Sequence, residues 1–238
     1  MTMNKLEQTI DWLKSAEQEH APQLVFACSF GAEDVVLIDL IAKHAAATRI
    51  ITLDTGRLPQ QTYDVMDACR ERYRLPVEVY FPNAADVEAM VREKGMNLFY
   101  DSIENRKQCC QVRKILPLKR ALTGASAWIT GLRREQAESR QDMQAIENDA
   151  NFGIKKYNPL IEWTHDDVWQ HIRENDVPYN KLHDQFYPSI GCAPCTRSVT
   201  IGEDPRSGRW WWEHEDTHAE CGLHVSSLIK PKGSNEDS

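Results

Sequence analysis

The chain has 238 residues, of which 41% are hydrophobic and 27% charged, and its formal net charge is -8. This composition predicts a folded domain with a hydrophobic core, and the negative charge argues against a nucleic-acid-binding protein. The sequence has no run of about 18 apolar residues, and its first twenty residues include acids and lack the apolar segment of a signal peptide. We therefore expect a cytoplasmic protein without membrane association, in which the seven cysteines are reduced or metal-bound.

Apolar runs and helical periodicity alternate along most of the chain. After an amphipathic helix at 3–19, strands are predicted at 24–28, 49–53, 77–81, 126–130 and 154–157, and helices at 33–44, 59–73, from 84 onward, 107–122 and 164–175. Strands that alternate with helices indicate a parallel sheet flanked by helices, an α/β fold. The chain is rich in loops after Pro178, so we expect one α/β domain over 1–200 and a C-terminal tail over 201–238.

Three turns directly follow predicted strands. SFGAED (29–34) places Ser29 and Gly31 just ahead of a helix, DTG (54–56) follows the second strand, and TGLRREQ (130–136) follows the fourth. Ligands of open parallel sheets collect at the carboxyl ends of the strands, and the first turn is expected to direct backbone N–H groups and a helix N-terminus toward an anion. Each turn alone is also typical of an ordinary loop, but the three together favour a ligand site.

Four cysteines occur as two close pairs. Cys109 and Cys110 are adjacent, and Cys192 and Cys195 form a C-x-x-C motif. Four thiolates suit either zinc or a 4Fe–4S cluster, although adjacent cysteines are awkward for a tetrahedral zinc ion. Three interpretations stay open from the spacing: a cluster, a zinc site, or unrelated buried cysteines.

The other three cysteines divide into two kinds. Cys28 and Cys69 lie on a predicted strand and a predicted helix, where a small buried side chain is the simplest interpretation. Cys221 lies in the polar segment ECGLH, next to a glycine. A thiol in such a segment is a candidate nucleophile if nearby cations lower its pKa, and otherwise an idle exposed thiol.

These motifs together resemble the assimilatory adenylyl-sulfate and phosphoadenylyl-sulfate reductases. The matching segments are SFGAED (29–34), LDTG (53–56), CCQVRK (109–114), TGLRREQ (130–136), NPLIEWTHDDVW (158–169), GCAPCT (191–196), RSGRWWW (206–212) and ECGLH (220–224). The resemblance implies an adenine nucleotide α-hydrolase-like fold, related to the PP-loop ATP pyrophosphatases. It implies one 4Fe–4S cluster per subunit on Cys109, Cys110, Cys192 and Cys195, and Cys221 as the nucleophile.

The same resemblance implies an activity. The enzyme would reduce adenosine 5′-phosphosulfate to sulfite and AMP through an S-sulfonate on Cys221, with thioredoxin or a glutaredoxin-like protein as reductant, in sulfate assimilation toward cysteine. The predicted substrate-binding residues are Ser29, Gly31, Leu53, Lys114, Gly131, Arg140, Arg206 and Arg209. Lys114, Arg206 and Arg209 are assigned to the sulfate and phosphate oxygens.

Three alternatives remain at this stage. The substrate could carry a 3′-phosphate, or the chain could be a PP-loop ATP pyrophosphatase of the tRNA-thiolating kind, although SFGAED differs from the SGG-type loop of those enzymes. A zinc-stabilised binding module without chemistry is the third. The oligomeric state is left open, with a homo-oligomer as one alternative.

Overall fold

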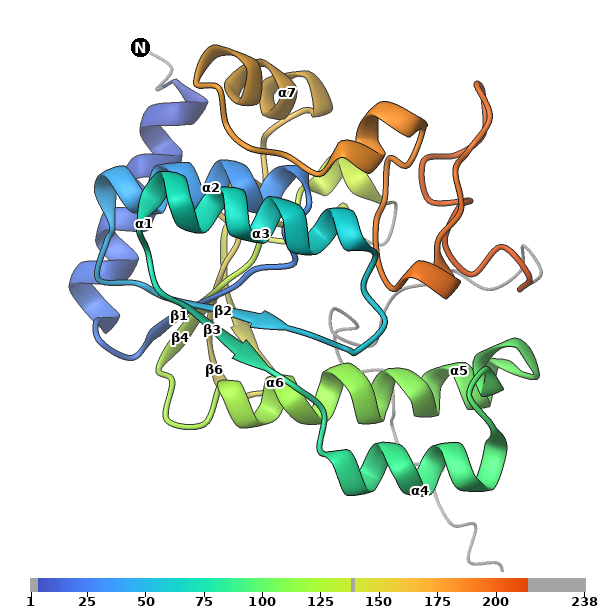
Figure 1. Cartoon of the computed structure of the whole chain (residues 1–238). Helices are drawn as coiled ribbons and strands as arrows, with labels where there is room; N and C mark the ends of the chain where they lie inside the picture. The colour runs from blue at the N-terminus through green and yellow to red at the C-terminus, as the bar shows by residue number, and fades with distance from the viewer. Residues whose placement is uncertain (1–3, 138–139, 214–238) are drawn as a thin grey trace, which may run out of the picture.

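A central sheet with helices on both faces organises the molecule (Figure 1). The computed structural model describes residues 4–137 and 140–213. The strands are β1 (Leu24–Ala27), β2 (Arg49–Leu53), β3 (Val77–Tyr80), β4 (Ala127–Ile129), β5 (Ile146–Asp149) and β6 (Ile154–Tyr157). The helices are α1 (Lys5–His20), α2 (Ala32–His44), α3 (Gln60–Tyr73), α4 (Ala84–Lys94), α5 (Ile103–Cys110), α6 (Leu116–Ala121) and α7 (His165–Glu174).

Within the described residues the strand order is β3-β2-β1-β4-β6-β5, and only the pairing of β5 with β6 is antiparallel. The chain leaves β1 toward β2 on one side and later returns to β4 on the other side. Strand order therefore reverses between β1 and β4, which opens a crevice at their carboxyl ends. The predicted ligand turns at Ser29 and Gly131 follow these two strands.

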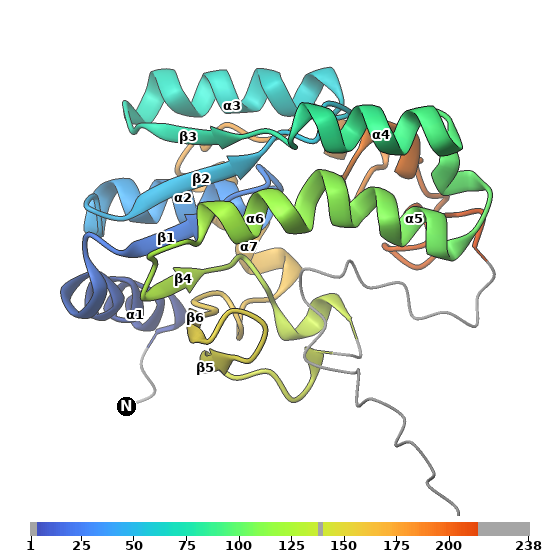
Figure 2. The same ribbon diagram turned by 90° about the horizontal axis from the view of Figure 1, so that it is seen from below.

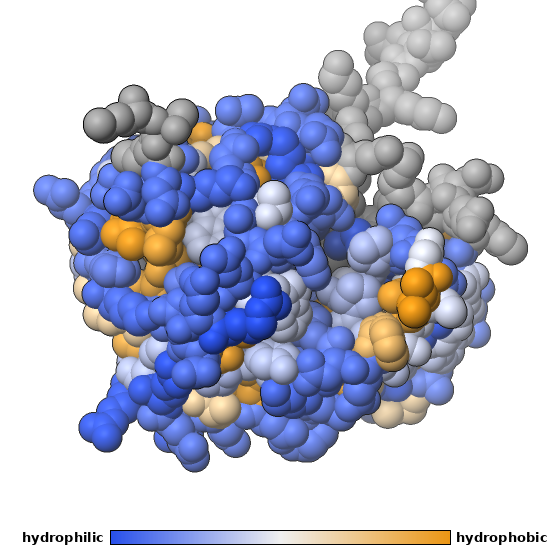
Figure 3. All heavy atoms as spheres, turned by 90° about the horizontal axis from the view of Figure 1, so that it is seen from above, coloured by the Kyte–Doolittle hydropathy of each residue, from blue (hydrophilic) through white to orange (hydrophobic). Residues whose placement is uncertain are grey.

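Successive side chains of the strands point to opposite faces of the sheet and pack into two separate cores. Leu24 and Phe26 of β1 pack into the larger core with α1, α2, α3 and α7, while Val25 packs on the opposite face with Trp128 and α6. Seen from below, α4 lies beside the continuous helical segment formed by α5 and α6, and both cover one face of the sheet (Figure 2). Helices α1, α2, α3 and α7 cover the opposite face of the sheet, and the outer surface on that side is mostly hydrophilic, with small separate hydrophobic patches (Figure 3). The predicted parallel sheet flanked by helices is confirmed.

Two features differ from the prediction. β5 was not predicted, because its residues are polar or half-exposed and it is held at the sheet edge by pairing with β6. The helix expected over 107–122 starts earlier, at Ile103, and is divided by a π-helical turn at Gln111–Ile115. Pro117 follows that turn, as the second residue of α6.

None of the helices among the described residues is both long and apolar enough to span a bilayer. The proposed division at residue 200 stays a prediction, since residues 214–238 lie outside the described part of the chain.

Candidate active site

A cavity of about 1010 Å³ opens at the carboxyl ends of β1, β2 and β4. Its wall combines the turns after these strands with α6 and the loop region that follows α7. All eight residues predicted to bind substrate line it: Ser29, Gly31, Leu53, Lys114, Gly131, Arg140, Arg206 and Arg209. The structure thus brings together residues that lie up to 180 positions apart in the sequence. We call this space the strand-end cavity.

A buried carboxylate organises the turn after β1. Asp34 Oδ2 accepts hydrogen bonds from the backbone N–H of Ser29 at 2.5 Å and from the Ser29 hydroxyl at 2.7 Å. Burial raises the pKa of Asp34 to about 6, although both hydrogen bonds oppose the shift. The backbone N–H of Phe30 is also engaged, by Cys28 Sγ. The expectation that these N–H groups face an anion is therefore wrong for Ser29 and Phe30, because side chains of the protein already accept from them.

The positive charges of the TGLRREQ segment are largely neutralised within the protein. Arg133 is buried and forms ion pairs with Glu33 at 2.8 Å and Glu135 at 2.9 Å. Arg134 pairs with Glu162 at 2.6 Å. These arginines connect the strand ends to one another. Four further cations that line the cavity come from other segments: Lys114, Arg140, Arg206 and Arg209.

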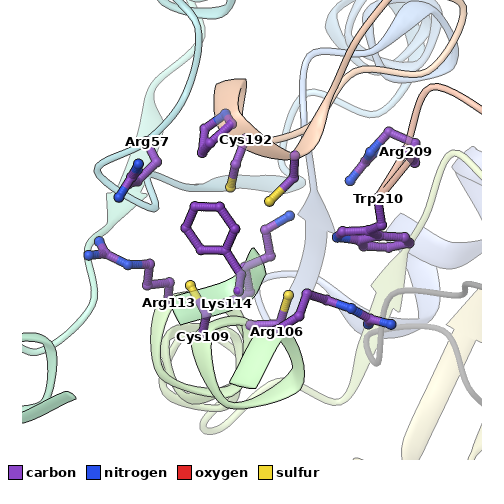
Figure 4. Close-up of a pocket in the computed structure, with 12 residues that line it drawn as sticks. Arg57, Arg106, Cys109, Arg113, Lys114, Cys192, Arg209 and Trp210 are labelled. Carbon is purple, nitrogen blue, oxygen red and sulfur yellow. The ribbon is translucent and has the colours of Figure 1, made fainter. Parts of the chain in front are cut away.

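A second, smaller cavity is lined by four cysteines, and we call it the cysteine cavity. Cys109 and Cys110 come from the end of α5, and Cys192 and Cys195 from the loop after α7. Cys109 and Cys192 extend toward one another across it (Figure 4). Its wall also carries five cations: Arg57, Arg106, Arg113, Lys114 and Arg209.

The donor set of the cysteine cavity fits an iron–sulfur cluster. Four thiolates around a 4Fe–4S core leave a net negative charge, which the surrounding cations would balance. Burial raises the pKa of Cys195 to about 12, although the nearby Lys114 and Arg209 act to lower it. The Thr55 hydroxyl lies 3.2 Å from Cys192 Sγ. Within residues 4–137 and 140–213, no three Cys, His, Asp or Glu side chains are grouped as they would be around a single metal ion.

The two cavities share a wall made by Lys114, Arg209 and Trp210. Arg209 lies so close to Gly191 that a Cβ on this glycine would be 2.3 Å from the guanidinium. Glycine is therefore needed beside the C-x-x-C motif for Arg209 to take this position. An ion bound in the strand-end cavity near Lys114 and Arg209 would lie next to the cysteines.

Several site residues were missed from the sequence. Asp34, Thr55 and Trp210 all lie inside segments already singled out, so their motifs were a usable signal. Arg106 and Arg113 face the cysteine cavity from helical positions. Arg113 lies inside the CCQVRK motif, whereas only its closeness to the Cys109–Cys110 pair pointed to Arg106. Cys28 and Cys69 are buried, at 4% and 2% exposure, as predicted. Cys221 lies outside the described residues.

An open α/β sheet with a ligand crevice at its strand switch and a four-cysteine cavity beside it defines a nucleotide-binding class of enzyme. The family model described as "Phosphoadenosine phosphosulfate reductase domain" matches residues 23–198. The chain belongs to this family, and the predicted reductase relationship is confirmed.

Curated relatives agree with this assignment. An adenosine 5′-phosphosulfate reductase of Allochromatium vinosum is 52% identical over 84% of this chain and 78% of its own length. One of Burkholderia cepacia is 46% identical over 93% and 88%. These names support the prediction of an oxidoreductase that acts on sulfur.

Solved structures agree on the fold. A phosphoadenylyl-sulfate reductase of Candida auris, in a phosphate complex, has a TM-score of 0.63 and 28% identity, covering 84% of this chain and 99% of its own. An FMN adenylyltransferase of Candida glabrata has a TM-score of 0.58 at 14% identity, covering 84% and 66%. The second likeness concerns the fold alone, and it agrees with the predicted adenine nucleotide α-hydrolase-like fold.

Proposed function

We propose that the protein reduces adenosine 5′-phosphosulfate to sulfite and AMP, with electrons from a dithiol protein of the thioredoxin type, as a step of sulfate assimilation. The observation that carries the proposal is the shared wall: a strand-end cavity large enough for a nucleotide meets a four-cysteine cavity at Lys114 and Arg209. The names of the curated relatives supply the substrate.

The strand ends suit a nucleotide. Ser29, Gly31, Leu53 and Gly131 line the part of the cavity next to the sheet, where small residues leave room for a base and ribose. We assign Lys114, Arg206 and Arg209 to the phosphate and sulfate oxygens, with Arg140 as a further cation. Preorganised cations of this kind stabilise the charge that develops on the leaving phosphate.

The chemistry requires a nucleophilic sulfur, and we assign it to Cys221. Its thiolate attacks the sulfur of the sulfate group, the bond from that sulfur to the bridging oxygen breaks, and AMP leaves with the electron pair. The enzyme then carries a cysteine S-sulfonate. A thiolate of the reductant attacks Cys221 Sγ and releases sulfite, and the second thiol of the reductant resolves the mixed disulfide.

Cys109, Cys110, Cys192 and Cys195 would hold a 4Fe–4S cluster. Because the two thiols of the reductant supply both electrons, the cluster would contribute structure and local charge. Lys114 reaches both cavities, so it would orient the sulfate end of the substrate beside the cysteines.

Two measurements test the proposal. A thioredoxin-coupled sulfite assay compares adenosine 5′-phosphosulfate with its 3′-phosphorylated form, and a parallel arm with ATP looks for pyrophosphate release. Intact-mass analysis of the enzyme with adenosine 5′-phosphosulfate should show an added SO3 group on wild type and on the control Cys69→Ala, and none on Cys221→Ser. Preference for the 3′-phosphorylated nucleotide would instead support a phosphoadenylyl-sulfate reductase, and pyrophosphate release a PP-loop ATP pyrophosphatase.

A further inference from the structure

The most buried arginine–glutamate pair near the site joins Arg106, in the wall of the cysteine cavity, to Glu213. Arg106 donates from Nε and Nη2 to the two carboxylate oxygens of Glu213, both at 2.7 Å. The two side chains are only 5% and 4% exposed. Arg106 belongs to α5, one helical turn before Cys109 and Cys110, whereas Glu213 is the last described residue before the segment that carries Cys221.

Arg106 also packs against the indole ring of Trp210, which lies in the wall shared by the two cavities. The guanidinium carbon of Arg106 lies 4.5 Å from the centre of the Trp210 ring, and that of Arg209 lies 4.9 Å from it. In Figure 4 the two arginines approach the indole from opposite sides. Trp210 is 2% exposed and has a φ of 48°, a left-handed conformation that a bulky residue keeps only where its surroundings impose it.

Further contacts join the segment 209–213 to the loop that carries Cys192 and Cys195. Trp212 donates from Nε1 to the carbonyl of Phe99 at 3.1 Å, and its ring lies 4.5 Å from that of Tyr100. The Tyr100 hydroxyl donates to the carbonyl of Pro194, inside the C-x-x-C motif, at 2.9 Å. Residues 209–213 are therefore held against both sources of the cavity cysteines.

Stability alone does not account for an ion pair in this place. A buried arginine–carboxylate pair adds little net stability compared with apolar side chains of the same size, because both charges must be desolvated. Its bidentate geometry does fix direction and distance. Arg49 and Glu78 form the same bidentate ion pair between β2 and β3, but their side chains are 33% and 41% exposed.

We propose that the buried Arg106–Glu213 pair is a positioning clamp, which holds Arg209 at the shared wall and fixes the backbone at Glu213, eight positions before Cys221 in the sequence. The inference rests on the proposed function, since it assigns a role in delivering Cys221. Cys221 lies eight positions after Glu213 in the sequence, so the covalent chain keeps it within roughly 26–29 Å of the clamp. Fixing Glu213 beside the shared wall therefore limits the volume that the thiol can reach.

The test separates delivery of the thiol from binding of the nucleotide. Glu213→Gln keeps the shape of the side chain and removes the charge, Arg106→Lys keeps the charge and removes the fork, and Glu78→Gln is the matched control in the exposed pair. Each full-length protein is examined for the single-turnover rate of SO3 addition at saturating adenosine 5′-phosphosulfate, for AMP affinity, and for absorbance near 400 nm.

We expect both clamp variants to add SO3 at least roughly ten-fold more slowly, because a displacement of about 1 Å can cost about 100-fold in rate. Their AMP affinity should stay within about three-fold of wild type, their absorbance should be unchanged, and Glu78→Gln should behave as wild type. A wild-type rate in the clamp variants would overturn the inference. So would a parallel loss of AMP binding and absorbance in both, which would show a merely structural pair. If wild type itself gains no SO3, the proposed function fails, and the clamp assignment fails with it.

Discussion

Helix α2 carries two buried aspartates, five residues apart, in different surroundings. Asp39 lies in the packed layer, where its carboxylate is 2.8 Å from His171 Nε2, 2.7 Å from Lys43 Nζ and 3.1 Å from the Tyr73 hydroxyl. Burial would raise the pKa of Asp39, but the hydrogen bonds from His171 and Lys43 outweigh it and lower the pKa. Within the described part of the chain, the carboxylate of Asp34, at the cavity end, accepts hydrogen bonds only from Ser29, and burial raises its pKa to about 6.

The contrast separates two uses of a buried charge. In the packed layer the Asp39 carboxylate is hydrogen-bonded to side chains of α2, α3 and α7, so it connects these helices. At the strand-end cavity the carboxylate is less compensated, which is typical of groups placed for ligand contact. Substitutions at these two aspartates and around the strand-end cavity test this difference.

Asp39→Asn should lower the free energy of unfolding by about 3 kcal/mol at pH 7, because it leaves buried partners without their carboxylate. The pKa of Asp39 is lower in the folded protein than its ordinary value of 3.8. Its contribution is therefore present above about pH 4 and is lost as the pH falls through the folded pKa. Urea unfolding at pH 7 and at pH 3.5 should show the difference shrinking at the lower pH. The exposed Asp11→Asn is the control, and an equal loss there would contradict the assignment.

Asp34→Asn should show the opposite pH dependence. Because the folded pKa of Asp34, about 6, exceeds its ordinary value of 3.8, its contribution is fully present below about pH 4 and is lost as the pH rises through 6. The loss is about 3 kcal/mol, at about 1.4 kcal/mol for each unit between the two values. The variant should therefore gain stability relative to wild type between pH 4 and pH 7. Urea unfolding measures the difference in free energy of unfolding between variant and wild type at pH 4 and at pH 7. An equal difference at both pH values would disprove a raised pKa of Asp34.

Lys114→Ala should weaken the binding of adenosine 5′-phosphosulfate by roughly 10- to 100-fold. A hydrogen bond to a charged group contributes about 1.5–3 kcal/mol, and Lys114 is assigned to the sulfate end. Calorimetric titration in a Cys221→Ser background avoids turnover. The exposed Lys119→Ala on α6 should bind as the parent does, and unchanged affinity in Lys114→Ala would remove this lysine from the binding site.

Gly131→Ala should lower the free energy of unfolding by about 1–3 kcal/mol, as overpacking does in a tight site. A Cβ on Gly131 would lie 2.2 Å from Asp34 Oδ1. At Gly31 the nearest atom to an added Cβ is 3.6 Å away, so Gly31→Ala should be tolerated. Urea unfolding of the two variants compares them directly, and equal stabilities would show that Asp34 can move aside.

The strands and most helices could be predicted because burial leaves a local pattern. LVFA in β1 and RIITL in β2 are apolar runs that suit strands covered on both faces. β5 has no such run, since Ile146 is 43% exposed, and only its pairing with β6 makes it a strand. The π-helical turn at Gln111–Ile115 likewise has no sequence signature.

The site was predictable to the extent that its residues lie in motifs. The turns at Ser29, Leu53 and Gly131 and the two cysteine pairs could be named in advance, and the structure places them around two adjoining cavities. The Arg106–Glu213 pair could not, because its members are 107 positions apart and neither belongs to a motif. Glu33 and Arg133 both lie in motifs, but their ion pair was also hidden, because the two residues are 100 positions apart in the sequence.

The α/β alternation, the family and the chemical character of the candidate groups could be inferred from residue types and short spacings alone. The folded chain was needed to show which cations face a cavity, which aspartate of α2 has a raised pKa, and that Lys114, Arg209 and Trp210 border both cavities. Desolvation and charge pairing act through space, and their partners come from distant segments that meet only in the folded chain.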